Sequence, residues 1–212
     1  MAADEYRGKI LLRERVDTSA SSPVLAVQSV INPTIETWAG KRLRRISPSG
    51  SFAKGTANSS GTDIDLFVSL SSTTSSSLKE LYESLATALR DAGYAPRLQN
   101  VSLGIKIGDH DVDVVPAKRR GCFGNSHSLY KRRVGSWTKT NVAKHVALVS
   151  QSGRTEEIRI IKLWRKQQGI DFLSFYLELT VIEALKGRRS GNLAVNVMTV
   201  FDYLRDSFAS AR

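Results

Sequence analysis

The residues that are best suited to take part in chemistry are aspartates that occur two positions apart. Asp63 and Asp65 lie in the segment TDIDLFVSL, and Asp111 and Asp113 lie in HDVDVV. Both segments alternate polar and apolar residues as half-buried strands do, so each pair projects from one strand face. If the strands are neighbours, these carboxylates converge and repel one another unless a cation neutralises them. Oxygen ligands alone favour Mg²⁺, or Mn²⁺, over zinc.

An isolated Asp-x-Asp pair is more often a solvated strand face, but the residues before this pair favour a site. They read GSFAKGT, from Gly50 to Thr56. Gly50 allows the backbone to approach a phosphate closely, Ser51 adds a hydroxyl group and Lys54 adds a positive charge. The segment is not a Walker loop, because the chain has no G-x-x-x-x-G-K-[ST] string.

Together these motifs resemble the signature of the DNA polymerase β-type nucleotidyltransferase superfamily. Within it, the sequence is similar to archaeal CCA-adding enzymes, 2′-5′-oligoadenylate synthetases and bacterial enzymes like cyclic GMP–AMP synthase that make signalling nucleotides. The resemblance implies that three aspartates are catalytic and hold two Mg²⁺ ions. It leaves Asp111 as a neighbouring polar contact or a surface charge. The motif residues are Gly50-Ser51, Gly55-Thr56, Asp63-Ile64-Asp65 and Val112-Asp113-Val114-Val115-Pro116.

Further nucleotide-binding residues are implied in the second half of the chain. In EEIRIIKLWRKQ, Arg159, Lys162 and Lys166 form a basic ridge at helical spacing, which by itself is equally typical of a solvated face. The resemblance implies that Lys162, with Ser174 at the start of the next helix, holds the triphosphate. His145 matches a triphosphate-contacting histidine of the CCA-adding enzymes less closely, and a partly buried structural role explains it equally well.

The chain is expected to be an α+β protein, with a polymerase β-like mixed sheet flanked by helices and followed by a helical lobe. We assign 1–138 to the catalytic core and 139–212 to the helical lobe, which is either compact or truncated at its C-terminus. Pro33 predicts a kink or break in the first helix, and 117–138 reads as basic and irregular. The expected elements are strands at 42–49, 62–70, 96–107 and 110–115, a turn at 50–61, and helices at 23–39, 78–93, 140–151, 155–168, 172–187 and 193–209.

Charge and composition narrow the partners. The 212 residues carry a net charge of +11, which favours polyanionic ligands such as nucleotides or nucleic acid. The longest apolar runs are too short to span a membrane, and the N-terminus lacks the apolar stretch of a signal peptide. A single cysteine, Cys122, excludes an internal disulfide framework. We therefore expect a cytoplasmic protein; its oligomeric state stays open.

These features predict a template-independent, Mg²⁺-dependent nucleotidyltransferase that uses an NTP, with ATP favoured. The favoured acceptor is a nucleotide hydroxyl, which would give a linear or cyclic oligonucleotide signal of the antiviral-defence kind. Two alternatives stay open: CCA addition or other transfer to an RNA 3′ end, and a non-catalytic nucleic-acid-binding or antitoxin-like module. The basic segment, with Tyr130 and Trp137, could hold an RNA or oligonucleotide acceptor. Transfer to a small molecule such as an aminoglycoside fits the core but not this segment.

Overall fold

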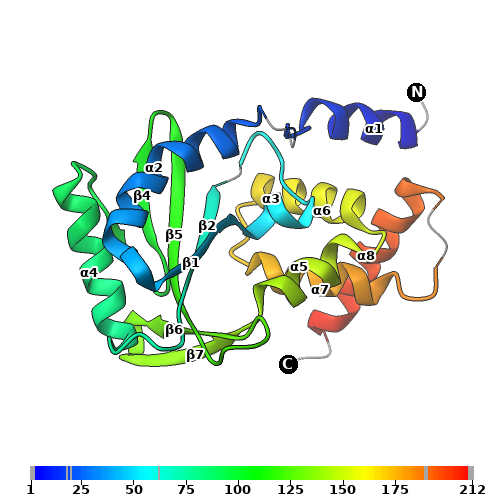
Figure 1. Ribbon diagram of the computed structural model, residues 1–212. Coiled ribbons are helices and arrows are strands. Elements are labelled where there is room, and N and C mark those ends of the chain that lie inside the picture. Colours follow the sequence, from blue (N-terminus) through cyan, green and yellow to red (C-terminus); the bar gives the residue numbers. More distant parts are fainter. Residues whose placement is uncertain (1–2, 18, 20, 62, 189–190, 210–212) are drawn as a thin grey trace. The chain divides into compact units, whose positions relative to one another are not determined.

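The computed structural model divides the chain into two compact units, which we describe separately (Figure 1). The sheet unit comprises Asp17–Ala53 and Asp63–His145. The helical unit comprises Met1–Val16, Lys54–Thr62 and Val146–Arg212. The structure describes residues 3–17, 19, 21–61, 63–188 and 191–209.

The bounds of these units differ from the division expected at residue 138. The helical unit also takes in the N-terminal residues and the segment that precedes Asp63. The reason is a set of polar contacts made by Arg159, whose guanidinium donates hydrogen bonds to the carbonyl groups of Leu11 and Glu14 and to Asn58 Oδ1. Such side-chain contacts leave no periodic signal in a sequence.

The sheet unit is built on one mixed sheet, in which seven strands are described. β2 pairs in parallel with β5, and every other pairing in the sheet is antiparallel. The order is β1-β2-β5-β4-β3, and β6 joins β5 to β7. The strands are β1 Leu43–Pro48, β2 Ile64–Leu70, β3 Arg97–Leu98, β4 Leu103–Ile107, β5 His110–Arg119, β6 His127–Lys131 and β7 Ser136–Thr140.

Two helices, α2 (Pro23–Ala39) and α4 (Leu78–Asp91), pack against one face of this sheet (Figure 1). Ser22 caps α2 by accepting a hydrogen bond from the Val24 N–H at 3.2 Å, as its position predicts. The expected break at Pro33 is wrong, because α2 runs through it. Apolar residues on both sides of the proline hold the helix on the sheet: Val24, Val27, Ile31, Ile35 and Ala39.

The alternation of residues along β2 and β5 gives the sheet one apolar face and one face that carries the aspartates. Ile64, Leu66, Val112 and Val114 are buried in the core beneath α2 and α4. The intervening residues, which include Asp65, Asp111 and Asp113, therefore project from the other face. Farther along that face, Phe67, Val115 and Ala117 pack in a second, smaller apolar cluster.

The segment 117–138 is not irregular, as the sequence suggested, but contributes the end of β5, β6, most of β7 and the short 3₁₀ helix η2 (Arg132–Val134). Its basic residues masked a pattern of inward-facing ones. Leu129 is buried in the smaller apolar cluster, and the Tyr130 ring meets Tyr82 edge-on at 5.7 Å between centroids. Tyr130 therefore anchors the strand to the core.

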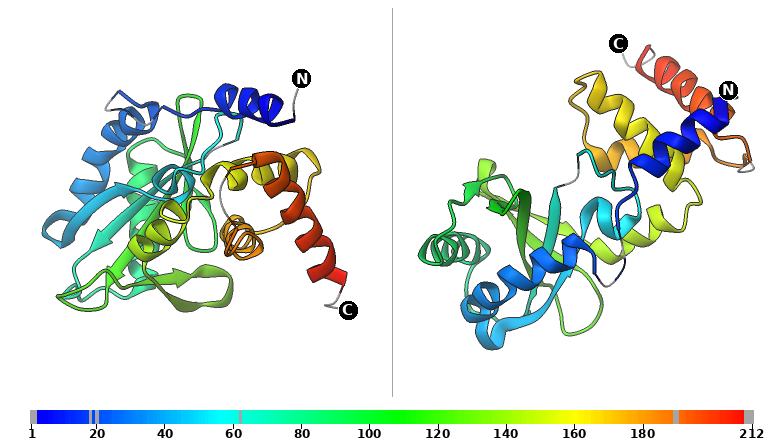
Figure 2. Two further views of the ribbon diagram at one scale, coloured as in Figure 1. Left: turned by 90° about the vertical axis from the view of Figure 1, so that its right-hand side faces the viewer. Right: turned by 90° about the horizontal axis from the view of Figure 1, so that it is seen from above.

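The helical unit has its own apolar core, formed by α6 (Thr155–Gln167), α7 (Ser174–Ala184) and α8 (Leu193–Ala209). The N-terminal helix α1 (Ala3–Arg13), which the sequence analysis did not anticipate, packs against α6 and α8 (Figure 2). In the described part of the chain, no helix has both the length and the apolar character needed to cross a membrane. Two helices continue from one unit into the other: α3 (Gly50–Lys54) and α5 (Val142–Ser150).

A buried histidine links β2 to β6. The Nε2 atom of His127 lies 2.8 Å from Ser69 Oγ, and its Nδ1 atom lies 3.0 Å from the Asn125 carbonyl oxygen. Since a carbonyl oxygen can only accept, Nδ1 carries the hydrogen and Nε2 accepts from the serine hydroxyl. Burial lowers the pKa of His127, and the charge of Arg119 lowers it further.

This pairing predicts a loss of stability in mild acid. As the pH falls through about 6.5, the unfolded chain takes up a proton that folded His127 resists, so the free energy of unfolding decreases. In urea titrations at pH 7.5 and pH 5.0, His127→Gln should lose less stability between the two pH values than the wild type. His110→Gln, which changes an exposed histidine in the same unit, should lose as much as the wild type. Equal losses in all three proteins would contradict the assignment.

Candidate active site

The sheet brings together two of the three predicted aspartates. In the parallel register of β2 and β5, Asp65 is the direct partner of Asp113. Register partners project from the same face of a sheet, so the two carboxylates are neighbours. Asp63 lies just before β2, is exposed, and acts on Asp113 through its charge. All three aspartates therefore belong to one neighbourhood of the sheet unit.

The Gly-Ser motif lies directly against Asp65. The Ser49 N–H donates a hydrogen bond of 2.8 Å to the Asp65 carbonyl oxygen, which places the next residue over the carboxylate. A β-carbon added to Gly50 would lie 1.7 Å from Asp65 Oδ2, and the φ angle of Gly50 is +56°. Only glycine fits both requirements. The expected turn at 50–61 begins instead with helix α3, whose second residue is Ser51.

Asp113 is half-buried and held by polar partners. Gln99 Nε2 donates to its Oδ1 atom at 2.8 Å, and Ser102 Oγ donates to its Oδ2 atom at 3.4 Å. Burial raises the pKa of Asp113, and the negative charge of Asp63 raises it further. Asp111 differs, since it forms an ion pair of 2.7 Å with Arg97 near the surface. That pairing supports Asp113 as the third functional aspartate.

The fit of this site to a divalent cation depends on its donor atoms. Among the residues that the structure describes, no three His, Cys, Asp or Glu side chains are grouped so that they could hold a metal ion as they stand. The three aspartates nevertheless supply oxygen donors alone, which suit Mg²⁺ or Mn²⁺. Burial is the main cause of the raised pKa of Asp113, and the negative charge of Asp63 adds to it. A cation would relieve the repulsion between neighbouring carboxylates, so the chemistry of the donors suits the ion.

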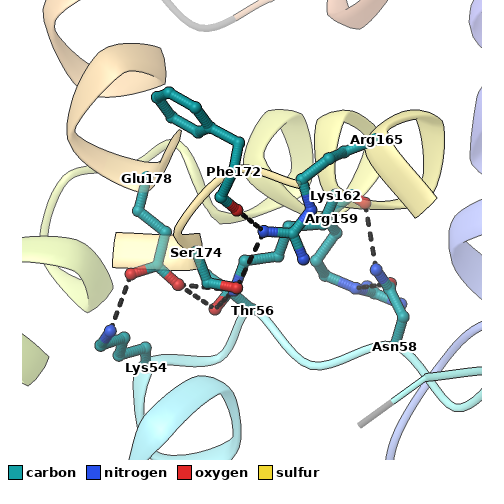
Figure 3. Close-up of polar contacts among 9 residues, drawn as sticks. All are labelled: Lys54, Thr56, Asn58, Arg159, Lys162, Arg165, Phe172, Ser174 and Glu178. Atoms are coloured by element: carbon teal, nitrogen blue, oxygen red, sulfur yellow. Dashed lines mark hydrogen bonds and ion pairs between the residues drawn. The ribbon is translucent and has the colours of Figure 1, made fainter. Parts of the chain in front are cut away.

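The helical unit brings together three other predicted residues and several that the sequence analysis did not select (Figure 3). Lys54 Nζ lies 2.8 Å from Glu178 Oε2, and Lys162 Nζ contacts Glu178 Oε1. Lys162 Nζ also donates a hydrogen bond to Thr56 Oγ1 at 2.8 Å. Within the predicted basic ridge, Lys162 is only 8% exposed and Arg159 is partly buried, whereas Lys166 is exposed.

Ser174 begins α7, as the resemblance implied, and is exposed. Its Oγ atom accepts a hydrogen bond from Arg165 Nη1 at 3.0 Å (Figure 3). His145 lies partly exposed in the first turn of α5 in the sheet unit, where its N–H donates to the Asn141 carbonyl oxygen at 3.0 Å. The sequence analysis did not select Arg165.

Glu178 is the most informative of the missed residues. Its side chain is almost fully buried, and both of its oxygens bind lysines. Burial alone would raise its pKa, but Lys162 and Lys54 outweigh this effect and hold the pKa below its ordinary value. A usable signal was present, since Glu178 stands inside the apolar run FLSFYLELTVIEAL, where a charged residue needs a partner.

Comparisons with known proteins show which proteins the chain is similar to. A curated protein, the cyclic AMP-AMP-AMP synthase of Escherichia coli (strain MS 115-1), is 29% identical over 182 residues. The alignment covers 76% of this chain and 57% of that protein, so the chain spans little more than half of its relative's length. No protein-family model matches the chain.

Solved structures extend the likeness to nearly the whole fold. The Elizabethkingia meningoseptica CdnE cyclic dinucleotide synthase with GTP and Apcpp matches 100% of this chain and 86% of its own, with a TM-score of 0.80 at 15% identity. The E. coli MS115-1 CdnC:HORMA-deltaN complex matches 95% and 71%, with a TM-score of 0.69 at 23% identity. The chain therefore has the polymerase β-type nucleotidyltransferase fold, in the form found in bacterial cyclic-nucleotide synthases.

Proposed function

We propose that the protein transfers a nucleoside monophosphate from an NTP to the hydroxyl group of another nucleotide and releases pyrophosphate. The observation that carries the proposal is the pairing of Asp65 with Asp113 in parallel register, with Gly50 against the Asp65 carboxylate. The product would be a cyclic or linear oligonucleotide signal. The similar proteins include a cyclic AMP-AMP-AMP synthase and a cyclic dinucleotide synthase, and these activities favour a nucleotide acceptor.

The proposed division of labour follows the chemistry of the side chains. Asp63, Asp65 and Asp113 would hold two Mg²⁺ ions, or Mn²⁺, which activate the attacking hydroxyl and neutralise the departing pyrophosphate. Gly50 and Ser51 would bind phosphate oxygens through backbone N–H and hydroxyl groups. In the reaction, the acceptor oxygen bonds to the α-phosphorus as the bond to pyrophosphate breaks. Asp113 would accept the acceptor's proton.

The residues of the helical unit would bind the phosphates of the NTP, and ATP is the favoured NTP. Lys54 and Lys162 supply positive charge, Ser174 supplies a hydroxyl group, and His145 of the sheet unit is a further candidate contact. Two metal ions do not neutralise a triphosphate together with three carboxylates, so ammonium groups are needed as well. NTP supply and the exposed free thiol of Cys122 both suit a cytoplasmic location.

Transfer to an RNA 3′ end is the second candidate function, and one surface favours it. Trp137 on β7 is 54% exposed, and the Arg120 guanidinium lies 5.1 Å from the centre of its ring. Lys139 is exposed two residues farther along the same strand face. An exposed indole between cationic groups can stack on an unpaired base. This surface would hold an RNA or oligonucleotide acceptor.

Removal of two carboxylates should abolish the reaction without unfolding the protein. We expect Asp63→Asn combined with Asp65→Asn to release no pyrophosphate from NTP and Mg²⁺, a loss of at least about a thousandfold, because the ligands of the ions are lost. Circular dichroism should be unchanged, since the change removes like charges. Asp109→Asn, an exposed aspartate in the turn before β5, is the matched control and should keep full activity.

Thin-layer chromatography of reactions with labelled ATP, GTP, CTP and UTP separates the candidates. Oligonucleotide or cyclic products support the proposed acceptor. Labelling that needs added tRNA supports transfer to RNA ends. No product in any reaction, with tight and salt-sensitive RNA binding, supports the non-catalytic module. Turnover that survives in the double variant excludes these carboxylates as the catalytic groups.

Gly50→Ala should be far more damaging than an alanine at another glycine with the same backbone angle. Gly135 has φ +58°, and an added β-carbon there meets no atom within 4 Å, whereas at Gly50 it would collide with Asp65. Gly135→Ala should therefore cost only about 1–2 kcal/mol of folding free energy and leave activity intact. Gly50→Ala should reduce kcat/KM at least about a hundredfold. Similar kinetics for the two variants would contradict the contact with Asp65.

A further inference from the structure

Two lysines converge on one glutamate within the helical unit (Figure 3). Glu178 Oε2 accepts from Lys54 Nζ at 2.8 Å, and Oε1 accepts from Lys162 Nζ and, at 3.0 Å, from Thr56 Oγ1. The lysines come from the end of α3 and the middle of α6, and the glutamate comes from α7. One carboxylate therefore fixes the positions of two ammonium groups from different elements.

This cluster carries one positive charge more than its negative charge balances. Relative side-chain exposure is 1% for Glu178, 9% for Lys162 and 11% for Lys54. Burial lowers the pKa of Lys162, and Lys54 and Arg165 lower it further, while the charge of Glu178 opposes the shift only in part. An excess of charge in a place with so little water is costly to maintain. A purely structural ion pair would need only one lysine.

The geometry leaves capacity for an anionic ligand. An ammonium group has three N–H donors, and Thr56 and Glu178 engage two of those of Lys162. Lys54 directs its ammonium to one glutamate oxygen and lies 4.7 Å from the centre of the Phe175 ring. Ser174 lies one helical turn before Glu178, and Arg165 already orients its hydroxyl oxygen.

We infer that Glu178 is a positioning residue, whose carboxylate holds the ammonium groups of Lys54 and Lys162 in place to receive the polyphosphate of an NTP. The inference rests on the proposed function and adds a residue and a charge balance to it. A triphosphate brings about four negative charges and accepts hydrogen bonds in several directions. It therefore matches two fixed ammonium groups whose combined charge one carboxylate only half neutralises. Glu178 itself does not touch the nucleotide.

Glu178→Gln tests this role, because glutamine keeps the size and one acceptor oxygen but removes the charge. We expect the KM for NTP to rise at least about tenfold while kcat changes much less, since Lys162 loses the charge that keeps it protonated and in place. Glu183→Gln, in the same helix, is the matched control. Glu183 is exposed and paired with Lys186 at 3.3 Å, and its replacement should change neither constant.

Binding of inorganic tripolyphosphate, measured by calorimetry, separates this inference from the proposed reaction. We expect at least about tenfold weaker binding by Glu178→Gln at pH 8.5, with much of the loss recovered at pH 6.5. The charged neighbours of Lys162 are Glu178, Lys54 and Arg165. Without the negative charge of Glu178 the pKa of Lys162 falls, so the ammonium group is lost at pH 8.5 and regained at pH 6.5. A role in folding alone would lower the melting temperature without this pH-dependent affinity. Unchanged or tighter binding overturns the inference.

Lys54→Met provides a second test that does not depend on the folding of Glu178→Gln. It removes the excess charge and leaves a balanced pair of Lys162 with Glu178, so the variant should fold at least as stably as the wild type. It should also bind tripolyphosphate at least about tenfold more weakly. Lys186→Met, which removes the exposed partner of Glu183, is its control. Equal affinities in these two variants overturn the inference, and a wild type that binds tripolyphosphate but transfers no nucleotide contradicts only the proposed reaction.

Discussion

The parallel pairing of β2 with β5 is the contact on which the arrangement of the aspartates depends. Its register places Asp65 opposite Asp113, and buries Ile64 opposite Val112 beneath α2 and α4. A slip of one residue would exchange the two faces. Carboxylates would then lie in the apolar core, and apolar side chains would lie where the aspartates meet. The hydrophobic effect that forms the core therefore also specifies where the acidic groups meet.

The same register sets the demands on the chain around it. With Asp65 fixed in the strand, the turn out of β1 must pass over its carboxylate without a side chain, and Gly50 meets that need. With Asp113 fixed opposite, its carboxylate needs partners that tolerate a nearby negative charge. Gln99 and Ser102 provide them as neutral donors. The site thus needs a residue without a side chain next to Asp65 and neutral hydrogen-bond donors next to Asp113.

How much of this arrangement the sequence predicts depends on whether the relevant interaction is periodic. β2, β5 and α4 follow from their hydrophobic patterns, and the strands place Asp65 and Asp113 on one face of the sheet. β6 and β7 were missed because basic residues concealed the inward positions of Leu129 and Tyr130. The strand expected at 62–70 begins at Ile64, so Asp63 lies just before it, and Thr62 lies outside the described residues.

Glu178 and the 56–60 segment could not be placed in the same way, because their positions depend on side chains from distant parts of the sequence. Glu178 meets Lys54 across 124 residues, and Asn58 meets Arg159 across 101. No local pattern encodes such pairs. Only the general rule that a charged residue in an apolar helix needs a partner pointed to the first of them.

The basic ridge of α6 makes contacts of the same kind with the 56–60 segment. Lys162, Arg159 and Lys166 bind in turn to Thr56 Oγ1, to Asn58 and to the Ser60 carbonyl oxygen. These partners are alternate residues of the segment that leads to Asp63. Each contact joins residues more than 100 positions apart, so the 56–60 segment is held by side chains that no local pattern of the sequence encodes.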